Sequence, residues 1–149
     1  MRVNRDLRAL AGGGRRGWPI VALAMWLPLS MPAAAQTAAP AGDPVAGEKA
    51  FALCGICHRV GPGATNAVGP VLNGVVGRHS GIYPDFMYSD ANKKSGLVWD
   101  EKTLAAYLPD PQKLVPGTTM PIGLPDAKDV ADVIAYLKQF DAQGNKKAP

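Results

Sequence analysis

Apolar residues in the last third of the chain recur at helical spacing. Four of them fall at positions i, i+3, i+4 and i+7: Val130, Val133, Ile134 and Leu137. They follow Asp126, a residue type that caps helix N-termini, so the pattern predicts a helix from Asp126 to about Phe140. Three charged residues of this segment lie largely off the apolar stripe: Lys128, Asp132 and Lys138.

Three shorter segments also carry helix start and stop signals. Asp43-Pro44 combines a capping residue with a proline suited to the first helical position, and Gly47 and Phe51 then share one helix face. A short helix is predicted from Ser89 to Gly96, with the serine as its cap. Another is predicted from Asp100 to Leu108, and prolines at 109 and 111 stop it.

Two long segments between these helices have no periodicity. Residues 61–81 are rich in glycine and proline, and the apolar residues between them must be buried: Val71, Leu72, Val75 and Val76. Residues 113–125 are interrupted by prolines and glycines in the same way. No strand pattern and no internal repeat is present, so the 149 residues predict a single all-α domain with long loops.

Both cysteines of the chain stand next to one of its two histidines, in Cys54-Gly55-Ile56-Cys57-His58. C-x-x-C-H is the pattern of covalent c-type haem attachment. Two thiols three positions apart each add to one vinyl group of the haem, and the adjacent imidazole then lies under the iron. A large flat cofactor also explains the long loops, because the haem rather than a sheet supplies the apolar surface that they cover.

Three other interpretations of the cysteines compete with haem. A disulfide between Cys54 and Cys57 would close so short a loop that it would constrain the unfolded chain little. A zinc site needs about four protein ligands, and only His79 remains outside the motif. A thioredoxin-like dithiol is typical of a βαβ pattern, and no strand signal precedes Cys54. The sequence therefore favours haem.

The N-terminus has the pattern of a secretory signal peptide. Residues 1–17 carry five arginines against one acid, residues 18–31 are apolar, and Ala33-Ala34-Ala35 follows. We expect residues 1–35 to be removed between Ala35 and Gln36. The alternative, an uncleaved membrane anchor, is disfavoured because two prolines interrupt an apolar run shorter than the ~20 residues of a spanning helix.

Cleavage at this position defines the remaining segments and their charge. We expect a flexible mature N-terminus over 36–42, one domain over 43–141 and a flexible tail over 142–149. The formal charge of +4 falls to zero, since 11 basic and 11 acidic side chains remain. This neutral balance argues against nucleic acid as a partner, and export indicates a periplasmic protein with no membrane span after cleavage.

The second axial position of the iron decides between an open and a closed haem. The candidates are His79, Met87 and Met120, with lysines as outsiders. Met120 stands in a Pro-Gly loop that can hold a side chain at a fixed point. Met87, between Phe86 and Tyr88, is interpreted as core or haem-pocket packing, and His79 as solvated.

Several segments resemble the class I cytochromes c, in the group of bacterial cytochrome c2 and mitochondrial cytochrome c. The resemblance extends from about Gly42 to Phe140. It rests on Gly42-Asp43 with Gly47 and Phe51, Gly69-Pro70, Gly77-Arg78, Tyr88-Ser89-Asp90-Ala91-Asn92, Leu97-Val98-Trp99, Pro116-Gly117-Thr118-Thr119-Met120 and Ala131 to Leu137. It implies the class I cytochrome c fold, a few helices and long loops wrapped around one haem.

The resemblance also implies roles for individual residues. Cys54 and Cys57 would bind the haem covalently, and His58 and Met120 would be its axial ligands. Pro70 would accept the hydrogen bond of the axial histidine. The remaining residues would line the propionates or the methionine: Tyr88 and Trp99 as donors to one propionate, Arg78 and Asn92 as their support, Thr118 near the other propionate, and Tyr107 near the methionine sulfur.

The chain departs from the family around the exposed haem edge. Gln112 and Thr119 occupy positions where lysine is common in the mitochondrial proteins, and residues 121–125 carry no charge. Lys49, Lys113 and Lys128 remain as candidates for docking acidic partners. The sequence therefore argues against strong electrostatic docking.

These features favour a soluble, monomeric, periplasmic electron carrier with one haem c, rather than an enzyme. The partners implied are a cytochrome bc1-type reductase, a terminal oxidase, a photosynthetic reaction centre or a periplasmic dehydrogenase. A carrier dedicated to one dehydrogenase is an alternative. A haem peroxidase or gas-binding protein is a weaker one, because only His79 is left to serve as a distal base.

Overall fold

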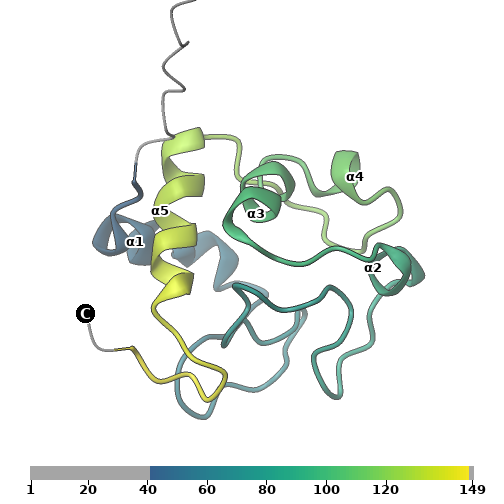
Figure 1. Cartoon of the computed structure of the whole chain (residues 1–149), viewed down its shortest axis with the longest axis horizontal. Helices are drawn as coiled ribbons and strands as arrows, with labels where there is room; N and C mark the ends of the chain where they lie inside the picture. Colours follow the sequence, from purple (N-terminus) through teal and green to yellow (C-terminus); the bar gives the residue numbers. More distant parts are fainter. Residues whose placement is uncertain (1–40, 148–149) are drawn as a thin grey trace, which may run out of the picture. The chain divides into compact units, whose positions relative to one another are not determined.

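The computed structural model describes residues 41–147. The predicted signal peptide, its cleavage site and most of the predicted mobile N-terminal segment lie outside this range. Within it the chain forms five helices, α1 (Pro44–Cys54), α2 (Asp90–Lys94), α3 (Glu101–Tyr107), α4 (Pro111–Leu114) and α5 (Ala127–Lys138) (Figure 1). The described residues contain isolated bridges but no strand, and none of their helices is long and apolar enough to span a membrane. The all-α prediction is confirmed.

The helices begin where the capping residues predicted. The side chains of Asp43, Ser89, Asp100 and Asp126 each accept a hydrogen bond from a backbone N–H of the first turn of their helix. Because these donors have no partner inside the helix, a carboxylate or hydroxyl at this position fixes where the helix starts.

Helix α4 was not predicted, because Pro111 was interpreted as a stop signal. The structure shows Asp110 capping the backbone N–H of Lys113, with Pro111 buried at the first helical position. This is the same Asp-Pro start that begins α1 at Asp43-Pro44. The segment predicted as loop from residue 113 therefore begins inside a helix.

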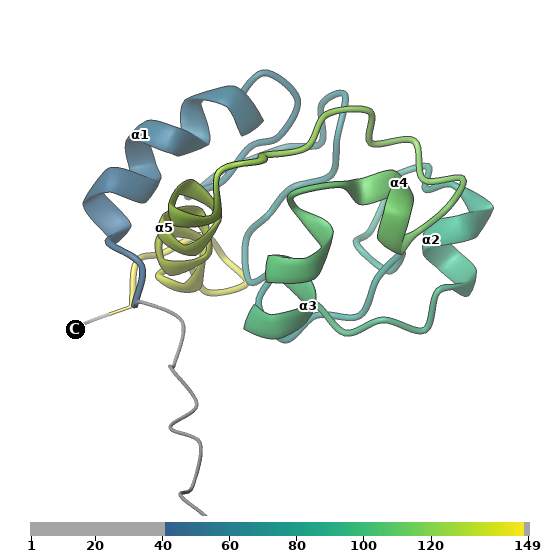
Figure 2. The same cartoon turned by 90° about the horizontal axis from the view of Figure 1, so that it is seen from above.

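Helices α1 and α5 lie side by side, although they come from opposite ends of the described chain (Figure 2). Gly47 makes the close approach possible, because a Cβ at this position would overlap the Asp132 carbonyl oxygen and lie 2.9 Å from Tyr136 Cβ. One turn further on, the rings of Phe51 and Tyr136 pack with centroids 5.3 Å apart. The contact buries the apolar stripe predicted for α5.

Asp132 differs from its predicted place off the apolar stripe, because it is buried with 2% of its surface exposed. Its carboxylate accepts a hydrogen bond from Asp43 N at 2.7 Å and pairs with Lys128 Nζ at 2.5 Å. The Lys128 hydrogen bond, and then that of Asp43 N, lowers the pKa of Asp132. A charge on the inner side of α5 thus ties that helix to the start of α1.

The segment after α5 includes the start of the tail that the sequence predicts to be flexible over 142–149. As far as Lys147 it follows a hydrogen-bonded path, in which Lys147 N donates to Gln139 O at 2.7 Å. The Asp141 carboxylate accepts from the backbone N–H groups of Gln143 and Asn145. Gly144 is buried and approaches the backbone of Gly61 too closely for a side chain.

Side chains organise the long segment between α1 and α2 where secondary structure is absent. Asn73 is buried, accepts from Gly61 N at 2.8 Å and donates to Gly61 O at 2.9 Å. Val71 and Val75 are 0% and 4% exposed, which confirms that these loop residues are buried. The loop therefore has a fixed course without a helix or a sheet.

Candidate haem site

All eleven residues that the resemblance assigns to the haem site line one cavity. They are Cys54, Cys57, His58, Pro70, Arg78, Tyr88, Asn92, Trp99, Tyr107, Thr118 and Met120. The rest of the lining is mostly apolar and comes from α1, α3, α5 and the loops between them. The empty space of the cavity, taken together with its mouth, which is open to solvent, amounts to about 1230 Å³. A large flat apolar cofactor fits such a space.

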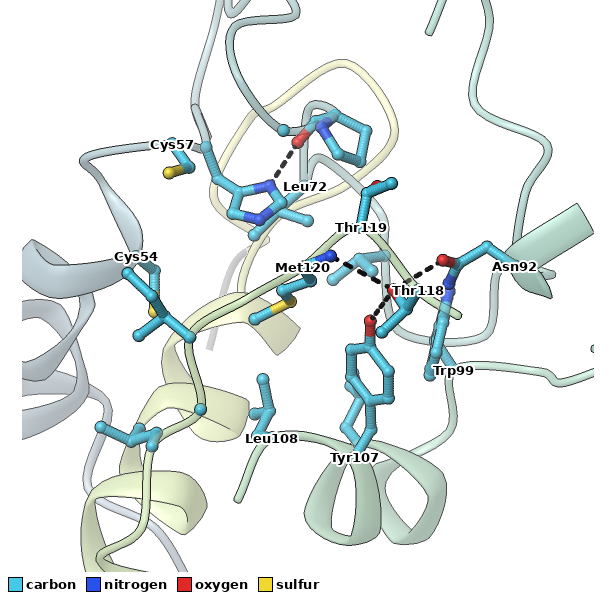
Figure 3. A pocket seen from close by; sticks show the side chains of 18 of the residues that line it. Cys54, Cys57, Leu72, Asn92, Trp99, Tyr107, Leu108, Thr118, Thr119 and Met120 are labelled. Carbon is cyan, nitrogen blue, oxygen red and sulfur yellow. Dashed lines mark hydrogen bonds between the residues drawn. The ribbon is translucent and has the colours of Figure 1, made fainter. Parts of the chain in front are cut away.

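The cysteines and His58 are presented by the tight turn that ends α1. His58 N and Cys57 N both donate to Cys54 O, at 2.9 and 3.1 Å. Cys54 and Cys57 are unpaired thiols, and Figure 3 shows them along one side of the cavity. Burial raises the pKa of the Cys54 thiol. The disulfide alternative is not what the structure shows.

One ring nitrogen of His58 is engaged in a hydrogen bond, and the other is free. Its Nδ1 lies 2.7 Å from the Pro70 carbonyl oxygen, and because a carbonyl only accepts, Nδ1 carries the proton and Nε2 is left as a ligand atom. Burial lowers the pKa of His58; the Pro70 bond opposes this shift, and the charges of Arg78 and Arg59 add to it. A neutral imidazole is the form that binds a metal.

Gly69 lets the chain pass directly over the His58 ring. A Cβ at residue 69 would lie 2.7 Å from His58 Nδ1 and 2.8 Å from Nε2. Gly69 N also donates to Cys57 O at 2.8 Å, so the segment that supplies the Pro70 carbonyl is fixed against the motif itself. The position of the imidazole is thereby set from two directions.

Three polar side chains form a connected group across the cavity from the cysteines (Figure 3). Thr118 Oγ1 donates to Asn92 Oδ1 at 2.7 Å, and the Tyr107 hydroxyl lies 3.0 Å from Thr118 Oγ1. A threonine hydroxyl has one proton, so in this arrangement Tyr107 is the donor to Thr118. The hydroxyl proton of Tyr107 is thus donated to Thr118.

Arg78 shows that the cavity suits an anionic group. Its Nη1 and Nη2 donate to the carbonyl oxygens of Asn73 and Val71 at 2.9 and 3.0 Å. Its Nε is buried and has no hydrogen-bond partner among the described residues. Burial lowers the pKa of Arg78, the opposite of what a neighbouring carboxylate would do. A haem propionate would supply both the missing acceptor and the missing negative charge.

Met120 and Met87 occupy different environments. Met120 is half-buried, packs against the core cluster and lines the cavity (Figure 3). Met87 is 90% exposed and is not among the lining residues, so its interpretation as core or pocket packing is wrong. The rings of Phe86 and Tyr88 meet edge to face 4.8 Å apart, and the side chain between them is turned out to solvent. His79 is exposed, as expected.

These features define a c-type haem protein. They are a helical fold, an apolar cavity with a C-x-x-C-H turn in its wall, and a buried arginine nitrogen that can bind an anionic group. A family model for cytochrome c matches residues 44–141. The chain belongs to the class I cytochrome c family, in the group of bacterial cytochromes c2, and carries one covalently bound haem c.

Known relatives match this chain over most of their own length. The cytochrome c2 of Blastochloris viridis is 52% identical over 116 residues, 77% of this chain and 91% of that protein. The cytochrome c2 of Rhodoblastus acidophilus is 56% identical over 107 residues, 71% of this chain and all of that protein. The structure of cytochrome cH from Methylobacterium extorquens matches with a TM-score of 0.61 and 52% identity, over 65% of this chain and 98% of that one.

Proposed function

We propose that this chain is a periplasmic electron carrier whose haem iron is closed on both sides, by His58 and Met120. That it is a cytochrome c electron carrier follows from its family and relatives. The observation that supports the closed iron is that the free Nε2 of His58 and the thioether of Met120 belong to the same cavity. A bound haem supplies one-electron exchange between ferric and ferrous iron.

The chain supports this exchange by positioning the axial ligands, excluding water from the haem and binding the charged propionates. Pro70 and Gly69 hold the imidazole, and Thr118 holds the loop that carries Met120. The apolar lining excludes water and, with a methionine ligand, favours the reduced state, in which the iron carries less charge. Arg78, Asn92, Tyr88 and Trp99 lie where they can bind the propionates.

A peroxidase would need a polar general base beside an open iron position. His79, the only histidine outside the motif, is exposed and does not line the cavity. The neighbours of Met120 along its loop that line the cavity, Thr118, Thr119 and Pro121, include no residue of the types that serve as a general base. The site therefore supports electron transfer better than peroxide chemistry.

The absorption spectrum of the purified holoprotein tests this function. We expect a low-spin ferric spectrum with the weak red band of methionine bound to ferric iron, and a ferrous spectrum that carbon monoxide does not change. A high-spin ferric spectrum, or ready carbonylation of the ferrous protein, would instead show an open iron. Met120 would then lose its proposed role, and a gas-binding or peroxidase function would replace electron transfer.

Location in the periplasm is proposed from the N-terminal signal pattern together with covalent haem attachment. We propose in addition that the mature protein is a monomer that moves between partners. The membrane reductases, oxidases and reaction centres, and the periplasmic dehydrogenases, all remain compatible with it. A carrier dedicated to one dehydrogenase would instead co-purify with that enzyme in fixed stoichiometry.

The mouth of the cavity is where such partners would approach, and its exposed lining is uncharged. The lining residues Leu53, Val68 and Ile122 are 42%, 78% and 46% exposed. Thr119 and Pro121 are also exposed lining residues, and neither carries a charge. Transfer between the mouth and a partner should therefore depend little on ionic strength, because Coulomb steering needs charges near the point of contact.

The salt dependence of oxidation by ferricyanide measures this directly. For the ferrous holoprotein we expect the second-order rate constant to change less than about twofold between roughly 0.01 M and 0.1 M salt, where the Debye length falls from about 30 to about 10 Å. The Ile122→Lys variant is the control. Its rate with this anion should start higher at low salt and fall more steeply. A steep fall in the unaltered protein would contradict an uncharged mouth.

A further inference from the structure

The side chain of Gln112, on α4, makes two hydrogen bonds with the backbone of the loop that leads to Met120. Its Nε2 donates to Thr118 O at 2.6 Å, and its Oε1 accepts from Gly117 N at 3.3 Å. One amide thus joins two consecutive residues of the loop to a helix. The sequence had singled out Gln112 only as a position without the family's lysine.

The bond from Gly117 N to Gln112 Oε1 selects one form of a reverse turn. Thr118 N donates to Val115 O at 3.0 Å, Pro116 is the second residue of the turn, and Gly117 has a φ of +90°. A proline followed by a residue at positive φ is a type II turn, which differs from type I by a flip of the central peptide. Accepting from Gly117 N, Gln112 holds that peptide in the type II orientation.

The bond from Gln112 Nε2 to Thr118 O acts on a residue that is also held from inside the cavity. Thr118 Oγ1 donates to Asn92 and accepts from Tyr107, while its carbonyl oxygen accepts from Gln112. The residue two positions before Met120 is therefore fixed from the core and from the surface at once. Met120 N lies 3.4 Å from the same threonine hydroxyl.

Helix α4 gives Gln112 a rigid base. Asp110 caps the helix, Pro111 is buried, and Val115 N donates back to Pro111 O at 2.9 Å. Beyond Met120 the chain is fixed again, where Leu124 N donates to Leu108 O at 2.7 Å. The Met120 segment thus spans two anchored points, and Gln112 ties its first half.

We propose that Gln112 is a positioning residue that keeps the Met120 thioether at the iron, by holding the 115–118 turn closed. The proposal rests on Met120 being the axial ligand, as proposed above. An amide is needed because it donates and accepts in one plane, whereas a lysine can only donate and a glutamate can only accept. The role is therefore specific to glutamine at this position.

Imidazole binding to the ferric holoprotein tests the proposal. Added imidazole reaches the iron only when the thioether has left, so at high concentration the observed rate levels off at the rate of Met120 release. We expect Gln112→Ala to raise this limiting rate roughly fivefold to tenfold, the effect of losing two partly exposed hydrogen bonds. Gln112→Glu and Gln112→Lys should give smaller increases, since each keeps one of the two bonds.

The control is Lys113→Ala, the exposed neighbour on α4, whose side chain has no hydrogen bond to the loop in the structure. Its limiting rate should match that of the unaltered protein. Thermal midpoints are measured in parallel, so that the rates are compared well below unfolding. The proposal is supported if the limiting rate of imidazole binding rises in Gln112→Ala and is unchanged in Lys113→Ala.

Two results would overturn it, and they differ in cause. Equal limiting rates in Gln112→Ala and the unaltered protein would remove the role of Gln112 while leaving Met120 as the ligand. A rate in the unaltered protein that rises linearly with imidazole, without levelling off, would show that no side chain has to leave. This result would disprove both the ligation of the iron by Met120 and the positioning role of Gln112.

Discussion

The Met120→Ala protein is expected to bind carbon monoxide when ferrous and to have a reduction potential lower by a few tenths of a volt. Axial ligands set haem potentials over a range of about 0.8 V, and a methionine lies toward its upper end. Removing the thioether leaves a half-buried gap beside the iron that water or carbon monoxide can enter. The red absorption band, a carbon monoxide titration and a potentiometric titration measure the three effects.

Met87→Ala is the matched control, because it removes the same side chain from a site that is 90% exposed. Its spectrum, potential and response to carbon monoxide should equal those of the unaltered protein. If Met120→Ala kept the red band and potential while Met87→Ala lost them, the ligand would be the other methionine. The two variants together thus assign the sixth position without reference to any relative.

Gly47→Ala should lower the free energy of unfolding of the holoprotein by about 3 kcal/mol or more, at the upper end for overpacked sites. The added methyl group would overlap the Asp132 carbonyl oxygen and press on Tyr136 Cβ at 2.9 Å. Backbone cannot move aside as a flexible side chain can, so α1 and α5 would have to separate along their contact. Guanidinium unfolding followed by far-ultraviolet circular dichroism measures the loss.

Glu48→Ala is the neighbouring control on α1. Glu48 is exposed, and its ion pair with Lys146 is long at 4.0 Å and also exposed. Its removal should therefore change the unfolding free energy by less than about 0.5 kcal/mol. A loss of stability in Gly47→Ala as small as that of Glu48→Ala would mean that the helices are not in the close contact described here.

The parts of the fold that the sequence predicted well are those with local causes. Capping residues such as Asp100 and Asp126 act within one turn, and the starts of four helices followed from them. Helix α4 was missed because a proline both ends and begins helices, and the Asp110 before it decides which. Burial of Asp132 was missed because its partner, Asp43 N, lies 89 residues away in the sequence.

The candidate site was predicted from a motif and a resemblance rather than from periodicity. All eleven named residues share one cavity, but their proposed roles go beyond this geometry. Loop residues show no hydrophobic periodicity that would predict their burial. Met87 was therefore interpreted as a buried residue, although it is exposed. The hydrogen bonds of Gln112 to the loop had no signal in the sequence, because its partners are backbone groups, which every residue possesses.

The 89-residue separation between Asp43 and Asp132 has a consequence for how the chain reaches its native state. A contact that distant must be found by diffusion of the two chain ends, and its entropic cost comes before any of its stabilisation is gained. The C-x-x-C-H turn lies at the end of α1, whereas the helix that α1 packs on is the last to be synthesised. We therefore expect the cavity to take its final form only after α5 has been synthesised.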